Sequence, residues 1–179
     1  ELCDGGELDE RIALAGRFSE AGAAAVMRQL LCAVHYLHSA HCLAHRDIKP
    51  GNCVFAGSRD SAMEDCEVKL IDFGMAAYCP EGHSLREVVG TMAYAAPEVW
   101  AGDYGLECDK WSLGMVLHEL LSGRLPRTCE DATRGDAWTR ISLDAQELVK
   151  GLLQKDPLHR WALERCLDSH WIQQRRRAP

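Results

Sequence analysis

The 179-residue chain contains no apolar run that approaches the roughly 18–20 residues needed to span a bilayer. It has no recognisable signal peptide, no internal repeat and no low-complexity tract, and it begins with Glu1, so we expect a fragment with no membrane partner. Basic residues are also in deficit, since 20 Lys and Arg stand against 27 Asp and Glu, a formal net charge of −7. This balance disfavours generic nucleic-acid binding, because phosphate backbones attract basic surfaces.

The nine cysteines include no C-x-x-C pair, which argues against a zinc ribbon. Their number is odd and their positions are widely spread. We interpret them as reduced, mostly buried thiols of a cytoplasmic protein, with a nuclear location also open. A disulfide framework remains the alternative.

Apolar periodicity predicts a mainly α fold with one small β-hairpin. Five segments have helical spacing and are predicted as helices: 8–14, 20–39, 111–121, 144–153 and 163–171. Ser19 is a suitable N-cap for the second of them, and Gly123 a suitable C-cap for the third. Two short apolar runs, 53–55 and 68–71, are predicted to pair as strands. Residues 74–96 and 124–140 have no periodicity and are predicted as irregular loops.

Two short segments concentrate the side chains that carry chemistry. The sequence HRDIKPGN occupies positions 45–52, and DFG follows at 72–74. Together they supply two carboxylates, one amide and one ammonium group. Phosphoryl transfer from ATP requires this set: a carboxylate for the attacking hydroxyl, oxygen ligands for Mg²⁺, and a cation near the transferred group.

The chain resembles the eukaryotic protein kinases over residues 1–172. The resemblance rests on H-R-D-x-K-x-x-N, then D-F-G, then A-P-E at 96–98, in this order and at these spacings. It implies a protein-kinase-like C-terminal lobe, with the N-terminal lobe absent from the chain. Lys49 and the Gly90-Thr91 pair are similar to Ser/Thr kinases rather than Tyr kinases. The segment before and after A-P-E most resembles the calcium/calmodulin-regulated and calcium-dependent group.

This resemblance implies roles for the central residues of the site. Asp47 is the expected catalytic base, and Lys49 the expected contact to the γ-phosphate of ATP. Asn52 and Asp72 are the expected Mg²⁺ ligands. The expected partners are ATP, Mg²⁺ and protein substrates that carry a Ser or Thr.

The resemblance also divides the chain into a hinge segment (1–7), a lobe (8–172) and a basic tail (173–179). The main chain of Glu1 and Cys3 is expected to bind the adenine edge, and Val54 to form the floor of the nucleotide pocket. Glu7 is expected to reach either the ribose or an Arg that precedes the target residue.

A further set of residues is implied to support the site. His45 and Phe73 are expected to stack, with Gly74 completing the triplet, and Asp109 to brace the catalytic loop. Thr91 is expected to bond the catalytic Asp and Lys. Glu98 and Arg160 are expected to form a buried ion pair.

Arg46 precedes the catalytic Asp, and in the family such an Arg often receives a phosphate from the activation loop. Acceptors between 75 and 95 are few, and Ser84 is one of them. We favour a permanent pairing of Arg46 with Glu81 or Glu87 instead.

Three departures from the family pattern bear on function. The Gly-rich loop, the strand lysine and its helix glutamate do not occur in these 179 residues, so we expect the isolated chain to bind ATP weakly and to be inactive. Gly51 replaces a glutamate that reads basic substrates. The stretch 124–140 is short by about one helix, on the order of a dozen residues.

Alternatives remain open beside a kinase. A pseudokinase or truncated scaffold fits the missing parts, whereas a metal-dependent phosphatase lacks its dense ligand cluster here. His35, His38, His41 and His45 could form a zinc site, but packing roles are favoured. Calcium-sensor regulation, if present, must act through regions outside this chain, because the chain contains no EF-hand loop.

Overall fold

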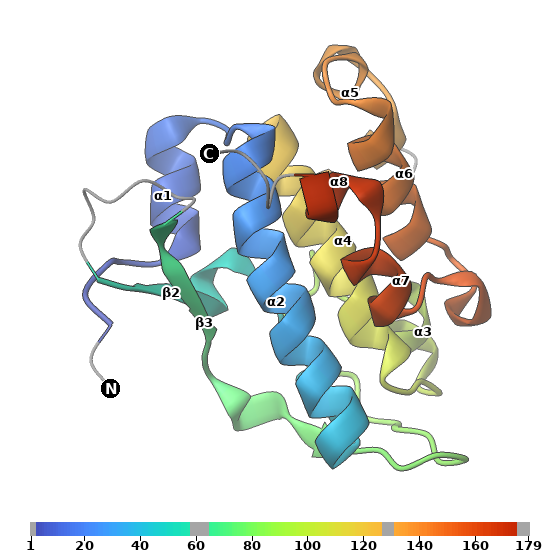
Figure 1. The fold of residues 1–179 in the computed structure, drawn as a ribbon. Helices are drawn as coiled ribbons and strands as arrows, with labels where there is room; N and C mark the ends of the chain where they lie inside the picture. The colour runs from blue at the N-terminus through green and yellow to red at the C-terminus, as the bar shows by residue number, and fades with distance from the viewer. Residues whose placement is uncertain (1–2, 58–64, 127–130, 175–179) are drawn as a thin grey trace.

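The computed structural model describes residues 3–57, 65–126 and 131–174. Helix α2 (Glu20–His41) and helix α4 (Glu107–Ser122) lie side by side in the middle of the molecule (Figure 1). The remaining longer elements pack around this pair: α1 (Leu8–Ala15), β2 (Cys53–Ala56), β3 (Glu67–Leu70), α6 (Leu143–Leu152), α7 (Leu163–Leu167) and α8 (His170–Gln174). The predicted fold class, mainly α with a small β-hairpin, is confirmed.

The local sequence accounts for both ends of α2. The Ser19 hydroxyl accepts a hydrogen bond from the Gly22 N–H at 3.0 Å, which caps the first turn. The helix ends where Cys42 adopts a left-handed conformation and its N–H bonds to the carbonyl of His38. The segment with the predicted catalytic residues, 45–52, follows after two further residues and is the catalytic segment.

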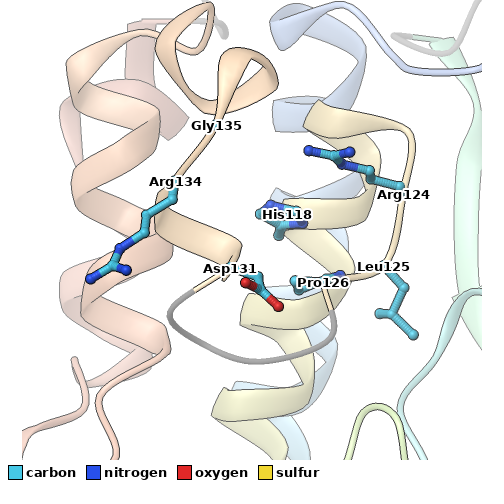
Figure 2. A pocket seen from close by; sticks show the side chains of 7 residues that line it. All are labelled: His118, Arg124, Leu125, Pro126, Asp131, Arg134 and Gly135. Atoms are coloured by element: carbon cyan, nitrogen blue, oxygen red, sulfur yellow. The ribbon is translucent and has the colours of Figure 1, made fainter.

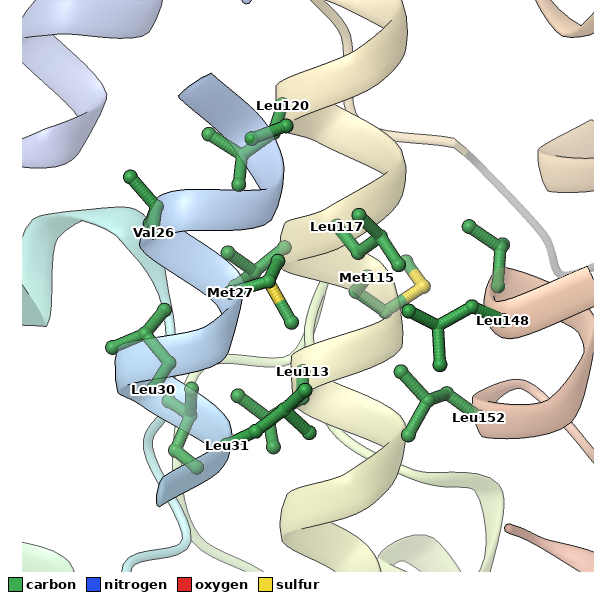
Figure 3. Close-up of a cluster of buried hydrophobic side chains, with 14 of the residues drawn as sticks. Val26, Met27, Leu30, Leu31, Leu113, Met115, Leu117, Leu120, Leu148 and Leu152 are labelled. Atoms are coloured by element: carbon green, nitrogen blue, oxygen red, sulfur yellow. The ribbon is translucent and has the colours of Figure 1, made fainter. Parts of the chain in front are cut away.

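The core lies between α2, α4 and α6 (Figure 3). Helix α4 is buried around almost its whole circumference, which is typical of a helix at the centre of a domain. The buried side chains of α2 and α4 that meet include Val26, Met27, Leu30, Leu31, Leu113, Leu117 and Leu120. On the other side of α4, Met115 lies beside Leu148 and Leu152 of α6.

The predicted hairpin is present, and the hinge segment pairs with it as a third stretch of main chain. Strands β2 and β3 pair antiparallel, with Val54 opposite Lys69. The hinge segment adds to β2, because the Gly5 N–H bonds to Phe55 O and the Phe55 N–H bonds to Gly6 O, each at 3.0 Å. A Cβ at Gly5 would lie 2.7 Å from the Phe55 Cβ, so this close approach requires glycine.

The predicted loop at 74–96 contains regular structure that the sequence did not indicate. Strand β4 (Ala77–Tyr78) pairs with β1 (Leu43–Ala44) in a second two-stranded sheet. Strands of two residues carry no alternation, so periodicity could not reveal them. The prediction of an irregular loop was wrong for this part.

The helices differ from the prediction in four further places. The single helix predicted over 163–171 is two helices, α7 and α8, with a break at Asp168 and Ser169. Helix α4 begins four residues before the predicted start, and α3 (Pro97–Ala101) was not predicted. A short helix, α5 (Asp136–Thr139), lies within the stretch 124–140. None of the helices in the described ranges combines the length and apolar character needed to cross a membrane.

Candidate active site

Asp47 is the centre of a hydrogen-bond network that joins two distant segments. Its Oδ2 accepts a bond from Lys49 Nζ at 2.8 Å and one from the Asn52 amide at 3.0 Å. Its Oδ1 accepts the main-chain N–H of Thr91 at 2.8 Å. Lys49 Nζ also donates to Thr91 Oγ1 at 2.8 Å. The predicted link between Thr91 and the catalytic pair is therefore present.

The electrostatics keep the Asp47 carboxylate ionised. Burial alone would raise its pKa, since the residue is only 9% exposed. The hydrogen bonds from Lys49 and Thr91 outweigh burial, and the pKa of Asp47 lies below its usual value. Asp47 is thus an acceptor oriented by fixed donors at neutral pH.

The two predicted metal ligands lie on segments that a main-chain hydrogen bond joins. The Asn52 carbonyl accepts the Ile71 N–H at 2.9 Å, which brings Asp72 next to the catalytic segment. The Asn52 amide nitrogen donates to Asp47, and Asp72 Oδ1 accepts only the Gly74 N–H, at 3.1 Å. One oxygen each of Asn52 and Asp72 has no partner among the described residues. These oxygens suit Mg²⁺, which prefers carboxylate and amide oxygen ligands.

His45 holds the DFG triplet against the catalytic segment. Its ring centroid lies 4.9 Å from that of Phe73, in an edge-on arrangement with an interplanar angle of 60°. The Asp47 N–H donates to His45 Nδ1, so Nε2 carries the proton and donates to Ile71 O at 3.0 Å. The rings of His45 and Phe73 are thus in contact, but they meet edge to face and do not stack as expected.

Asp109, which is buried near the start of α4, fixes the main chain of the catalytic segment. Its Oδ2 accepts the His45 N–H and its Oδ1 accepts the Arg46 N–H, both at 2.8 Å. His38 Nε2 lies 2.9 Å from Oδ2 of the same carboxylate. The predicted role of Asp109 therefore has a direct geometric basis, and His38 is an additional member that the sequence did not indicate.

Arg46 connects the catalytic segment to the middle of the activation segment, which runs from Asp72 to Glu98. Its guanidinium bonds to Met75 O, to Glu87 Oε2 at 3.2 Å and to the Tyr104 hydroxyl at 3.2 Å. The Tyr104 hydroxyl in turn donates to Glu87 O. Of the two acidic candidates from the sequence, Glu87 is the partner of Arg46. Tyr104 had no sequence signal, because only the tertiary structure brings it to this place.

Thr91 reaches Asp47 only because Gly90 precedes it. Gly90 has φ +89°, and a Cβ there would lie 2.2 Å from Arg46 O. No other residue type fits that approach without moving the backbone. The pair Gly90-Thr91 thus acts as one structural unit.

Three non-glycine residues in the described ranges have positive φ, and all border this site: Cys42, Arg46 and Asp72. Such conformations cost free energy and persist where the surroundings impose them. The Arg46 N–H donates to Asp109, and the Gly74 N–H donates to Asp72. These two hydrogen bonds favour the positive φ of Arg46 and of Asp72.

The pair Glu98–Arg160 anchors the C-terminal end of the activation segment. Arg160 donates to both oxygens of Glu98, with Nη2 to Oε2 at 2.7 Å, and to Glu107 O at 3.0 Å. Its guanidinium also lies over the Trp111 ring, 5.2 Å from the centroid. The arginine side chain is fully buried and that of Glu98 is 11% exposed, so the predicted buried ion pair is confirmed.

The segment expected to hold the adenine lies beside the hairpin. Glu7 forms an isolated β-bridge with Val54, which places the end of the hinge segment next to the predicted pocket floor. Cys3 is half-buried ahead of this pairing. Glu1 and the residues 175–179 of the basic tail lie outside the described residues, so their predictions stay predictions.

One cavity that the structure describes lies away from these groups. It has a volume of about 520 Å³ and is lined by residues from the end of α4 to Gly135, among them His118, Arg124 and Asp131 (Figure 2). This is the stretch 124–140 that we interpret as shortened. None of the catalytic candidates lines the cavity, so it is no candidate for the nucleotide site.

The zinc hypothesis finds no support in the described part of the chain. No group of three or more His, Cys, Asp or Glu is arranged there to hold a metal ion. His38 and His45 are instead engaged with Asp109 and Ile71.

This geometry defines the lower lobe of a protein kinase: a braced catalytic loop, a DFG turn and an anchored activation segment. A family model described as "Protein kinase domain" matches residues 1–172. The chain therefore belongs to the protein kinase family.

Its relatives are similar over the whole chain. Calcium-dependent protein kinase 9 of Oryza sativa subsp. japonica is 42% identical over 192 positions, which cover 100% of this chain and 33% of the relative. Calcium-dependent protein kinase 8 of Arabidopsis thaliana is 38% identical over 193 positions, with 100% and 35% covered. The chain thus spans about a third of the length of the curated relatives it matches. The resemblance to the calcium-dependent group is confirmed.

Proposed function

We propose that the protein of which these residues form a part transfers the γ-phosphoryl group of ATP to Ser or Thr hydroxyls of protein substrates. The observation that carries the proposal is the convergence on Asp47 of three donors from Lys49, Asn52 and Thr91. Asp109 also accepts donors on both oxygens and has a structural role, but Asp47 differs from it in accepting an ammonium group from Lys49. An ammonium group beside an oriented carboxylate is what transfer of a phosphoryl group to a hydroxyl requires.

Each residue of the site has its own proposed role in the transfer. Asp47 orients the attacking hydroxyl and accepts its proton late, because its lowered pKa makes it a weak base. Lys49, held between Asp47 and Thr91, offers its ammonium group to the transferred phosphoryl group. The free oxygens of Asn52 and Asp72 would hold Mg²⁺ on the phosphates. ATP–Mg²⁺, when bound, supplies the phosphoryl group and the cation that offsets its charge.

The remainder of the nucleotide site is proposed to come from sequence outside these residues. Phe73 is 46% exposed and Met75 is 43% exposed beside the catalytic segment. Adjacent exposed apolar side chains of this size mark a surface that another segment covers. Calcium-sensor regulation, suggested by the names of the relatives, would also lie outside the chain. The cytoplasmic location stays a proposal that rests on the unpaired cysteines.

The test is a phosphotransfer assay on the intact protein with matched Ser, Thr and Tyr peptides. Phosphate should enter the Ser and Thr peptides only. Asp47→Asn should lower the rate by about 10²–10⁴-fold, the usual range for loss of a general base, and a melting curve checks that the variant is folded at the assay temperature. An equal rate for Asp47→Asn would show that Asp47 is not the base, and no phosphate transfer by the intact wild-type protein would support a pseudokinase scaffold. A second arm uses residues 1–179 alone, for which robust phosphorylation would refute our expectation that this piece is inactive.

A further inference from the structure

Two cysteines lie close together where the catalytic segment meets the activation segment. Strands β1 and β4 pair Leu43 with Tyr78 and Ala44 with Ala77. Next to this ladder, the Cys79 N–H donates to Cys42 O at 2.7 Å. Cys42 itself is left-handed and ends α2, so a single main-chain hydrogen bond joins the two cysteines.

We propose that Cys42 and Cys79 form a reversible disulfide that ties the end of α2 to the activation segment. The hydrogen bond between Cys79 N and Cys42 O, with standard bond lengths, keeps the two Cα atoms within about 6.6 Å of each other. A disulfide needs roughly 4.4–6.8 Å between the two Cα atoms. The backbone therefore already holds the pair at bridging distance, and both thiols are free in the structure.

The other described cysteines lack such a partner in the strand registers. Cys53 lies opposite Leu70 in the hairpin, and Cys32 is exposed on α2. Cys108 and Cys166 are buried in helices, where burial raises the pKa of each thiol. Among the described cysteines, Cys42 and Cys79 are the pair that a main-chain hydrogen bond joins.

The environment decides which thiol reacts first. Cys79 is buried, and burial followed by the neighbouring Cys42 raises the pKa of its thiol. Cys42 is only half-buried and is the more accessible of the two. With a peroxide as the oxidant, the Cys42 thiolate attacks one peroxide oxygen, which gives a sulfenic acid and releases hydroxide. The Cys79 sulfur then displaces the hydroxyl group from the Cys42 sulfur, which forms the S–S bond and releases water once the Cys79 proton is transferred.

One existing contact must break for this to occur. The Cys79 Sγ donates to His83 O at 3.4 Å, and rotation about the Cα–Cβ bond would turn it toward Cys42. A weak thiol hydrogen bond opposes this rotation only slightly. The main-chain bond between the two residues is not affected.

The disulfide would close a chain loop that contains Asp47, Asn52 and Asp72. Covalent closure of a long loop stabilises a fold mainly by restricting its unfolded states. We expect the oxidised protein to keep the β1–β4 pairing at temperatures where the reduced protein loses it. The bridge would act as a redox-sensitive clamp on the base of the activation segment.

The test treats the intact native protein with hydrogen peroxide, blocks the remaining thiols with N-ethylmaleimide and identifies linked peptides by non-reducing mass spectrometry. The expected product joins the peptides that contain Cys42 and Cys79, and dithiothreitol separates them. The melting temperature should rise by roughly 5 °C on oxidation, a shift typical of a loop-closing disulfide in a domain of this size.

Three variants sharpen the experiment. Cys42→Ser and Cys79→Ser should each abolish the linked product and the shift in melting temperature, whereas Cys32→Ser, at an exposed position on α2, should keep both. The proposal is overturned if native wild-type protein gives no Cys42–Cys79 product while Cys32 is fully oxidised. It is also overturned if the product forms only after the protein is unfolded in urea. These two outcomes need no variant, so a variant that fails to fold does not block the test.

Discussion

The main-chain N–H of Thr91 donates to Oδ1 of Asp47 at 2.8 Å, across 44 positions of sequence. The same threonine accepts a hydrogen bond from Lys49 through its hydroxyl. The contacts of Thr91 therefore link the position of the activation segment to the orientation of the Asp47 carboxylate. If that segment moves away, Asp47 loses one of its three oriented donors.

Thr91→Ala should lower the turnover rate of the intact kinase by about 10–100-fold. The change removes the oxygen that holds the Lys49 ammonium, and a hydrogen bond to a charged group contributes about 1.5–3 kcal/mol. Thr91→Ser retains that oxygen and should stay within about threefold of the wild type. Steady-state kinetics with a Ser peptide measure both. Equal losses in the two variants would mean that the methyl group, not the hydroxyl, matters.

Asp109→Asn should destabilise the catalytic segment rather than remove a reacting group. The carboxylate accepts the N–H groups of both His45 and Arg46, and an amide cannot accept on its nitrogen side. We expect the free energy of unfolding in urea to fall by about 1–3 kcal/mol, the cost of an unsatisfied buried donor. The amides of His45 and Arg46 should also exchange faster with deuterium. Asp103→Asn, at an exposed position, is the matched control and should change neither quantity.

Removing one member of the buried pair Glu98–Arg160 should be costly. Arg160→Met leaves the Glu98 carboxylate buried without its cation, and the expected loss is about 3–5 kcal/mol of the free energy of unfolding. Glu98→Gln tests the other side. The double variant should lose less than the sum of the two single losses, because neither partner is then left as an isolated charge. Strict additivity in chemical denaturation would show that the pair is not coupled.

Glu87→Gln should reduce the activity of the intact kinase more than Ser84→Ala. Glu87 bonds to Arg46, and this supports permanent pairing at the arginine next to Asp47. Since the Glu87 side chain is 74% exposed, the pair contributes no more than about 1 kcal/mol, and we expect a loss of about two- to fivefold. A severe loss with Ser84→Ala together with full activity of Glu87→Gln would show that a phosphate, not Glu87, is the partner of Arg46.

The sequence was sufficient for the parts of the site that lie close together along the chain. Asp47, Lys49 and Asn52 fall within six positions, and the resemblance to protein kinases implies that their side chains act together. The long helices were also predicted well, because Ser19 and Gly123 mark their ends and their apolar faces repeat over several turns. Here local interactions and the tertiary fold favour the same structure.

Other features depend on groups that meet only in space. Tyr104 bonds to Arg46, and Glu119 accepts the Tyr94 hydroxyl at 2.7 Å, yet neither contact leaves a pattern in the sequence. The β1–β4 sheet and the hydrogen bond between Cys42 and Cys79 beside it likewise arise from strands too short to show alternation. The helices and the hairpin follow from short-range apolar spacing and capping, whereas the expected catalytic groups follow from the resemblance of the HRDIKPGN and DFG segments to protein kinases. Only the tertiary structure decided which distant residues hold those groups in place, because hydrogen bonds form according to distance in space and not according to separation along the chain.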